Sequence, residues 1–369
     1  MRGSTLAPDA ASAVEDLRSQ LLGTGLETPC VVIVFCSPDY DLDQLGPALK
    51  AGFPCPVIGC TTSGQIGPAG FQKDGLSAVA LSKPGLKIRP YLITPLEEVR
   101  DQAFAVATQV AQDFGPLPLL GFLLVDGLSM VEELLSSTLH HALGGMTLVG
   151  GSAGDNLAFH QTKVCFDGIF RQSAAVLLVM HADLPFAPIK FQHFAPTGVK
   201  LVATSAQPKA RIVETFNGMP AAKAYAKALN LSVEKLDPSV FSAHPLMLLI
   251  GDDYYVRSIQ RVLPDGSLAF YCAIDEALVF TLGQRLDNAT DIASRAFEEA
   301  FKAIGEPQVI LGCDCILRRL ELEAAGLDSE VGGLFAQRRV VGFSTYGEQW
   351  NGMHINQTFT GLALGSERV

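Results

Sequence analysis

The sequence predicts a mixed α/β protein, in which strands from two parts of the chain form a layered core of mixed sheets flanked by helices. A short apolar strand, a helix-like stretch and a second strand ending in a Gly-rich turn recur along it. Two copies match over a long distance, because 22 positions separate Gly59 from Leu81 and also Gly342 from Leu364. A looser copy lies between them, at residues 121–155. Such repetition predicts a duplicated β-α-β scaffold.

Local signals justify the elements of the first cassette. Gly23 and Gly25 end a helix-like stretch near the start of the chain. Two β-branched runs then flank a second helical stretch, the order expected where helices cover a sheet. The expected elements are a helix at 10–22, strands at 31–36 and 57–60 around a helix at 40–51, strands at 76–82 and 86–92 separated by a turn at Pro84-Gly85, and a helix at 97–114 that Gly115-Pro116 ends.

The elements after residue 119 follow from the same signals. A Pro-Asp-Gly sequence between apolar runs indicates a hairpin, and a proline is tolerated in the first turn of a helix. The expected elements are a helix at 129–143, strands at 163–167 and 174–181 paired through a turn at Asp167-Gly168, an extended stretch at 184–205, a helix from about Asn217 with Pro220 in its first turn, two strands within 246–274 joined by Pro264-Asp-Gly266, a helix at 289–303, and the third cassette. A domain boundary is expected within 185–205.

Composition excludes some functions. Lys and Arg total 27 against 38 Asp and Glu, a formal charge of -11, which argues against general affinity for nucleic acid or anionic membranes. The first 25 residues do not resemble a signal peptide, and no apolar run approaches the ~20 residues that cross a bilayer. We therefore expect a cytoplasmic protein whose eight cysteines are reduced thiols.

The Gly-rich turns have two interpretations. Each follows an apolar strand, and the carboxyl ends of strands are where α/β proteins commonly bind ligands. Hydroxyl groups and free backbone N–H groups there could hold a carboxylate or phosphate, or the glycines could only satisfy tight backbone geometry. A phosphate loop is excluded, because Gln65 and Glu348 stand where Lys-Ser/Thr would follow. The glycines concerned are Gly59, Gly64, Gly150, Gly154, Gly342 and Gly347.

Two histidines are candidate metal ligands. His193 lies between Phe191 and Phe194, an apolar and aromatic setting of the kind that an iron porphyrin needs. His354 follows the third Gly-rich turn directly. An isolated histidine with apolar neighbours is often structural, so that interpretation stays open for both residues.

Cys313 and Cys315 are a candidate thiol or zinc site. They end the first strand of the third cassette, where alternation points both sulfurs to one side and Asp314 to the other. No second Cys-x-x-Cys or His-x-x-x-His completes a structural zinc set.

The sequence does not show a recognisable catalytic set. No Gly-x-Ser-x-Gly is followed by a histidine in the arrangement that serine hydrolases use. We therefore do not expect an enzyme.

Several motifs resemble the FIST sensory module, whose N- and C-terminal parts would cover nearly the whole chain. They are Val57-Ile-Gly-Cys-Thr-Thr-Ser-Gly, Gly150-Gly-Ser-Ala-Gly-Asp155 and Gly342-Phe-Ser-Thr-Tyr-Gly-Glu348. The resemblance implies a helical segment at 1–28, a FIST N-terminal domain at 29–195 and a FIST C-terminal domain at 196–369. Further stretches resemble the nitric-oxide-sensing haemoprotein branch of the family: Asn217-Gly-Met-Pro-Ala-Ala222, Tyr254-Tyr-Val-Arg-Ser-Ile-Gln260, Leu311-Gly-Cys-Asp-Cys-Ile-Leu-Arg-Arg319 and Met353-His-Ile-Asn-Gln-Thr358.

The branch resemblance implies a bacterial sensor that binds haem b through histidine and takes nitric oxide as its ligand. His193 is then the first choice for the iron ligand and His354 the second. Phe191, Phe194 and Tyr346 are expected to contact the cofactor. Arginines suit the haem propionates, and the candidates are Arg257, Arg261 and Arg211.

The resemblance also implies that the signal passes to a partner, a histidine kinase or a cyclic-di-GMP enzyme, and a homodimer is possible. Two alternatives remain beside the haem hypothesis. Other FIST proteins are thought to bind small metabolites such as amino acids, which the Gly-rich turns could hold without iron. A thiol or zinc site at Cys313 and Cys315 could instead sense redox state.

Overall fold

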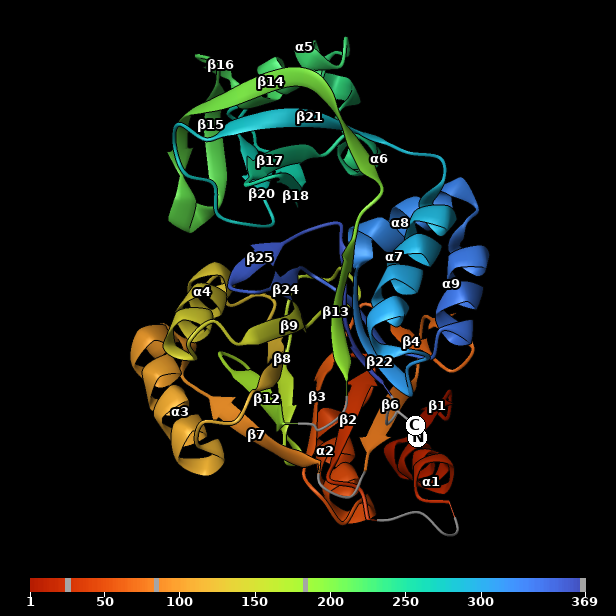
Figure 1. Ribbon diagram of the computed structural model, residues 1–369. Coiled ribbons are helices and arrows are strands. Elements are labelled where there is room, and N and C mark those ends of the chain that lie inside the picture. Colours follow the sequence, from red (N-terminus) through yellow and green to blue (C-terminus); the bar gives the residue numbers. More distant parts are fainter. Residues whose placement is uncertain (24–27, 83–85, 182–184, 366–369) are drawn as a thin grey trace.

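A computed structural model describes residues 1–23, 28–82, 86–181 and 185–365 of the chain (Figure 1). Its strands form three six-stranded sheets and one eight-stranded sheet, which confirms the predicted mixed α/β class. In the described part of the chain, no helix is both long enough and apolar enough to cross a bilayer.

The three six-stranded sheets are built from the three cassettes. The first has the order β1 (Arg2–Thr5), β6 (Leu76–Leu81), β2 (Val31–Cys36), β3 (Val57–Thr61), β10 (Val164–Phe166) and β11 (Ile169–Arg171). The second has the order β25 (Met353–Ile355), β24 (Glu348–Trp350), β9 (Thr147–Ser152), β8 (Leu120–Val125), β12 (Ala175–His181) and β7 (Lys87–Ile93). The third has the order β13 (Phe186–Phe191), β26 (Phe359–Leu364), β22 (Val309–Cys315), β23 (Val340–Thr345), β4 (Gln65–Gly67) and β5 (Gly70–Gln72).

The cassettes share one pairing plan, which confirms the predicted repeat. The first strand of each cassette pairs in parallel with the strand that ends in the Gly-rich turn: β2 with β3, β8 with β9, and β22 with β23. On its other side it pairs antiparallel with β6, β12 or β26. The looser second copy therefore has the same topology as the other two.

Each cassette also gives a hairpin to a neighbouring sheet. After the first Gly-rich turn the chain forms β4 and β5, and β4 pairs with β23 of the third sheet. After the third turn it forms β24 and β25, and β24 pairs with β9 of the second sheet. After the second turn it forms β10 and β11, and β10 pairs with β3 of the first sheet. The exchange therefore closes on itself and ties the three sheets together.

Three backbone hydrogen bonds repeat this cyclic arrangement within the Gly-rich turns. Ser63 N donates to the carbonyl oxygen of Ser344 at 3.1 Å, and Tyr346 N donates to that of Ser152 at 3.1 Å. Gly154 N donates to Thr61 at 3.0 Å and completes the ring. Because each turn is both donor and acceptor, no turn can move without breaking a bond to another.

Each of the three parallel strand pairs has one position at which only glycine fits. A Cβ atom on Gly59 would lie 1.9 Å from the carbonyl oxygen of Val34. The corresponding distances are 2.0 Å from Gly150 to Leu123 and 1.8 Å from Gly342 to Gly312. These are the paired residues of the three parallel ladders. The recurring glycine thus serves close backbone approach, the structural one of its two interpretations.

Helices cover the outer faces of the three sheets. One cluster of buried apolar side chains lies between the first sheet and helices α1 (Ala10–Leu21) and α2 (Leu42–Gly52). A second packs α3 (Val99–Phe114) and α4 (Glu132–Ala142) on the second sheet. A third packs α7 (Ala289–Ile304), α8 (Ile316–Ala325) and α9 (Asp328–Gln337) on the third sheet. The inner faces meet in a central core around Phe35 and Phe343, whose rings stack with centroids 4.8 Å apart. We call this three-sheet unit the body.

The remaining strands form a separate layer above the body in Figure 1. Residues 194–285, here called the inserted domain, leave the body after β13 and return to it before α7. Its sheet has the order β18 (Asp253–Arg257), β17 (Leu246–Ile250), β21 (Val279–Arg285), β14 (Phe194–Gln207), β15 (Ile212–Phe216), β20 (Leu268–Phe270) and β19 (Ile259–Val262), with β16 (Met219–Pro220) beside β15. Helices α5 (Ala221–Ala228) and α6 (Pro238–Ala243) complete a core of its own.

Some predicted elements differ from the observed ones. The expected pairing of 163–167 with 174–181 is wrong, because β10 and β12 lie in different sheets and the turn at Asp167-Gly168 joins β10 to β11. The helix expected from Asn217 begins at Ala221, with Pro220 as its N-cap residue. Residues 246–274 contain two hairpins, of which the one around Pro264-Asp-Gly266 was predicted. Strand β1 was not predicted, and the turn at Pro84-Gly85 lies outside the described residues.

Replacing Gly342 by alanine tests the close approach of the parallel strands. The new Cβ atom would overlap the Gly312 carbonyl oxygen, so we expect Gly342→Ala to lower the free energy of unfolding by about 3 kcal/mol. The matched control is Gly333→Ala in α9, where a Cβ meets nothing within 4 Å and should add up to about 1 kcal/mol through helix propensity. Equal denaturant midpoints for the two variants would contradict the packing argument.

Candidate functional site

A cavity of about 220 Å³ lies where the Gly-rich turns of the body meet the inserted domain. The body contributes the turn after β8, the loop after the second Gly-rich turn, and Tyr346 of the third turn. The inserted domain contributes the segments around Arg211 and Tyr271. We call this the junction cavity. Its walls are Gly127, Leu128, Met130, Phe159, Ala210, Arg211, Ile212, Gln260, Arg261, Leu263, Ala269, Phe270, Tyr271 and Tyr346.

Aromatic rings form one wall of the junction cavity. The rings of Phe159 and Tyr346 stack with centroids 5.0 Å apart and planes 23° apart. The ring centroid of Tyr271, in the inserted domain, lies 6.1 Å from that of Phe159. Stacked rings of this kind bind flat apolar or aromatic groups and also attract cations.

The loop that carries Phe159 is held in an unusual conformation. Asn156, Leu157 and Phe159 all have positive φ, between 53° and 65°. The Asp155 carboxylate fixes the loop by accepting hydrogen bonds from the backbone N–H groups of Phe159, His160 and Gln161, at 2.7–2.9 Å. The Tyr346 hydroxyl donates to the same carboxylate and accepts from Leu157 N at 2.8 Å. Backbone strain that the surroundings hold in this way is common at ligand sites.

Buried charges lie beneath the cavity. Arg211 has left-handed φ of 56°, and its Nη2 atom lies 2.5 Å from Glu132 and 2.9 Å from Glu133, both on α4. Burial raises the pKa of Glu132 to about 7, although Arg211 acts in the opposite direction. Arg211 is therefore already neutralised by the body. Arg261, on the rim, makes no ion pair with any described residue and can meet an anion.

His354 lies buried in β25, in contact with the third Gly-rich turn. Its Nδ1 donates to Gln349 Oε1 at 3.1 Å, and Gln349 Nε2 donates to Ser152 Oγ at 2.9 Å. Burial lowers the pKa of His354 to about 4, so the ring is neutral at pH 7. Its Nε2 has no hydrogen-bond partner among the described residues. A Cβ atom on Gly347 would lie 2.2 Å from its Cε1, so the turn covers this side of the ring.

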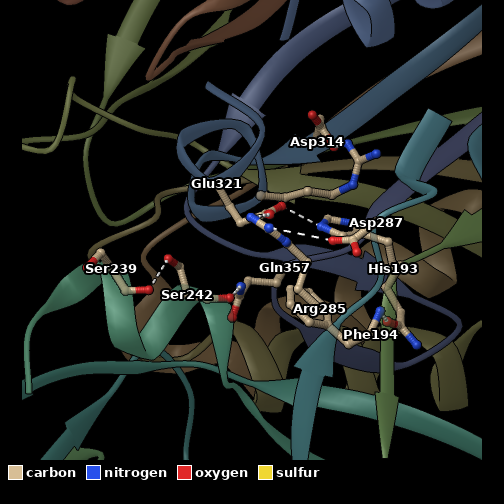
Figure 2. A network of polar contacts seen from close by, with 11 residues as sticks. His193, Phe194, Ser239, Ser242, Arg285, Asp287, Asp314, Glu321 and Gln357 are labelled. Atoms are coloured by element: carbon tan, nitrogen blue, oxygen red, sulfur yellow. Dashed lines mark hydrogen bonds and ion pairs between the residues drawn. The ribbon is translucent and has the colours of Figure 1, made fainter. Parts of the chain in front are cut away.

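His193 belongs to the segment that joins body and inserted domain. Its Nε2 bonds to Glu321 of α8, whose other oxygen lies 3.0 Å from Arg285 Nη1 (Figure 2). Its ring stacks on Phe194 with centroids 4.7 Å apart. Burial lowers its pKa, and Glu321 only partly opposes this effect. Glu321 therefore occupies Nε2, whereas Nδ1 has no hydrogen-bond partner among the described residues.

The predicted haem residues do not surround one cavity. Tyr346 lines the junction cavity, whereas Phe191 and Phe194 line another of about 330 Å³ beside Tyr255. His193, His354 and Arg257 belong to neither wall. Arg257 Nη1 instead donates to the carbonyl oxygen of His354 at 3.1 Å. Haem needs an open slot in front of the ligating nitrogen, and the described arrangement does not fit one at either histidine.

The cysteine pair is buried in β22. Both Cys313 and Cys315 are almost fully enclosed, and burial raises the pKa of each thiol well above its usual value. Asp314, between them, points elsewhere and lies 2.6 Å from Arg318. No three His, Cys, Asp or Glu side chains in the described ranges are grouped as metal ligands would be. The pair therefore has the environment of core residues, and the zinc and redox hypothesis gains no support.

A buried carboxyl group closes the third Gly-rich turn. Glu348 is fully buried, accepts hydrogen bonds from the Thr345 hydroxyl and from Thr358 N, and has a pKa well above its usual value because of burial. The first turn has Gln65 and Thr62 in the equivalent places, also hydrogen-bonded to each other. Glutamate and glutamine are close in shape, so the two repeats place similar side chains at this position.

Comparison with known families agrees with the motifs. A FIST N domain model matches residues 30–219, and a FIST C domain model matches residues 221–351. The chain belongs to the FIST family. FIST domains are sensory modules of signal transduction. No curated protein matches the chain.

Sequence reasoning identified part of the junction cavity. Tyr346 was a candidate contact residue, and Arg211 and Arg261 were considered as partners of an anionic group. Phe159 and Tyr271 were missed, because they belong to loops from different parts of the chain and neither has a motif. The one available signal was the position of Phe159, four residues after the Gly154-Asp155 turn.

Replacing Glu348 by glutamine tests the raised pKa of this carboxyl. A carboxyl whose pKa is higher in the folded than in the unfolded protein contributes stability that is fully present below the usual carboxyl pKa. This contribution is lost as pH rises toward the folded-state pKa. We expect Glu348→Gln to lose less stability than the native protein in urea unfolding as pH rises above the usual carboxyl pKa of about 4.3. Glu330→Gln, at an exposed position on α9, is the control and should follow the native protein. A native-like pH dependence in Glu348→Gln would show that this carboxyl is ionised.

Proposed function

We propose that this FIST protein senses a small organic anion that binds in the junction cavity. The observation that carries the proposal is the combination of the aromatic wall of Phe159, Tyr271 and Tyr346 with Arg261 on the rim, which has no ion pair with any residue that the structure describes. A carboxylate would meet the guanidinium and an apolar or aromatic group would lie against the rings. An amino acid or an aromatic carboxylate has this chemistry.

The position of the cavity supports a signalling role. Its walls come from both the body and the inserted domain, so a ligand there contacts both at once. Such a ligand favours the arrangement in which both walls are in place, and it shifts the equilibrium by its difference in affinity for the two arrangements. The state of the protein would then be transmitted to a partner, and the family resemblance favours a histidine kinase or a cyclic-di-GMP enzyme.

Thermal melting with a ligand panel tests this proposal. The panel contains the proteinogenic amino acids and simple aromatic carboxylates such as benzoate. A ligand at about 100 times its Kd stabilises the native state by about 2.7 kcal/mol. We expect Arg261→Ala to weaken binding about tenfold, because the carboxylate loses its charged partner. The matched control is Arg295→Ala, at an exposed position on α7. A panel that never raises the melting temperature, or equal shifts in both variants, would contradict the site.

Haem-dependent sensing of nitric oxide stays a prediction of the branch resemblance. His354 has one feature that favours it, a neutral ring with Nδ1 held by Gln349 and a free Nε2, which is how histidine ligands of metals are commonly oriented. Binding would require the covering turn at Gly347 to move away. Haem itself would supply the site for the gas.

Visible spectroscopy of protein purified with haem tests this second candidate. If it holds, the native protein shows a Soret band that nitric oxide shifts, and His354→Ala loses it while His193→Ala keeps it, because the Nε2 atom of His193 is bonded to Glu321. Loss in His193→Ala alone would restore the first choice made from the sequence. A native protein without a Soret band would end the haem hypothesis.

A further inference from the structure

Two chain segments connect the inserted domain to the body, and they lie side by side. The outgoing segment contains His193 between β13 and β14, and the returning segment follows β21 at Arg285. Leu286 N donates to the carbonyl oxygen of His193 at 2.9 Å and joins the two segments directly. Any rotation of the inserted domain must therefore pass through this pair of segments, which we call the hinge.

One carboxylate of the body holds both segments of the hinge. Glu321 of α8 accepts from His193 Nε2 with one oxygen and lies 3.0 Å from Arg285 Nη1 with the other (Figure 2). The side chains of Glu321 and His193 are 3% and 1% exposed. A buried carboxylate that loses such partners is strongly destabilised, because its charge stays without compensation. Glu321 therefore ties both segments of the hinge to α8, in addition to the ion pairs of Arg211 with α4 that also join the inserted domain to the body.

The same helix reaches the junction cavity. One turn before Glu321, Leu317 packs in a buried cluster with Cys315 and Tyr346, and the rim of this cluster includes Tyr271. Tyr346 and Tyr271 are also walls of the cavity. Residues four apart lie on one side of a helix, so α8 presents one side to both the cavity wall and the hinge. A rigid helix of this kind can move as one unit.

We propose that Glu321 is a latch that holds the inserted domain on the body, and that α8 links this latch to the state of the junction cavity. A role of the latch in regulation rests on the ligand site proposed above. The contacts of Glu321 with the hinge do not depend on that site. The latch also gives His193 a role other than iron binding, as a positioning residue of the hinge.

Hydrogen exchange measured by mass spectrometry tests the latch without any ligand. We expect Glu321→Gln to accelerate exchange of the hinge amides, in residues 186–197 and 283–290, about tenfold or more. The matched control is Glu323→Gln on the same helix, which also breaks an ion pair with an arginine, Arg319 at 3.1 Å, but away from the hinge. It should change hinge exchange less than about twofold. Equal acceleration in the two variants would overturn the latch.

A second variant distinguishes a local effect at the hinge from general unfolding caused by Glu321→Gln. Arg285 is 37% exposed, so Arg285→Ala removes one latch contact without opening the core. It should accelerate exchange in the same hinge residues and leave α1 and α3 unchanged. Acceleration spread evenly over the protein, or none at the hinge, would contradict the proposal.

A double-mutant comparison tests the link through α8. Tyr346→Ala loosens the cavity wall, and we expect it to accelerate hinge exchange about threefold when Glu321 is intact. In the Glu321→Gln background it should add little, because the latch is already open. If the fold increases in hinge exchange rate of the two single variants multiply in the double variant, the link is overturned. No ligand is present in these experiments. They can therefore support the latch when the ligand panel gives no shift, and they can contradict the latch when the panel supports the ligand site.

Discussion

The ring of three backbone hydrogen bonds between the Gly-rich turns is the constraint on which the rest of the structure depends. Within this ring each turn donates to one neighbour and accepts from the other, and Ser344 N and Ser152 N add bonds to Gly64 and Gly347. Each turn also sends its following hairpin into another cassette's sheet. The three sheets therefore cannot fold as independent layers. Their inner faces are buried only when all three turns meet, which couples the hydrophobic core to a few polar groups at one end of the strands.

This arrangement explains why the junction cavity lies where it does. Strand ends in α/β proteins expose side chains at a common edge, and here the ring holds that edge rigid. Tyr346 is fixed by its backbone bond to Ser152 and by its hydroxyl bonds to the loop at Asp155. The inserted domain then covers this edge with Arg211 and Tyr271. A wall fixed by the ring of turns and a wall from the inserted domain thus meet in one cavity.

Local sequence patterns predicted the strands and helices of the cassettes because hydrophobic periodicity and turn residues are properties of short segments. The exchange of hairpins was not predictable in this way. Residues 163–167 and 174–181 look like one hairpin, but β12 pairs with β7 and β8 while β10 crosses to β3. Strand partners depend on how sheets are arranged in space, and the same limit applies to the site. Tyr346 belongs to a motif, whereas Phe159 and Tyr271 meet only after the inserted domain has packed on the body.

The position of His193 shows why a sequence setting alone does not identify a ligand. Its phenylalanine neighbours indicated an apolar pocket, and the ring is indeed buried on Phe194. What decides its chemistry is Glu321, which lies 128 positions later in the chain. Glu321 gives His193 a fixed hydrogen bond at Nε2 and leaves Nδ1 without a partner among the described residues. In His354 the neutral amide of Gln349 holds Nδ1, and Nε2 is the nitrogen without a hydrogen-bond partner in the described part of the chain. The fold thus determines which nitrogen of each buried histidine is engaged, and it places a charged group beside His193 Nε2 and a neutral one beside His354 Nδ1.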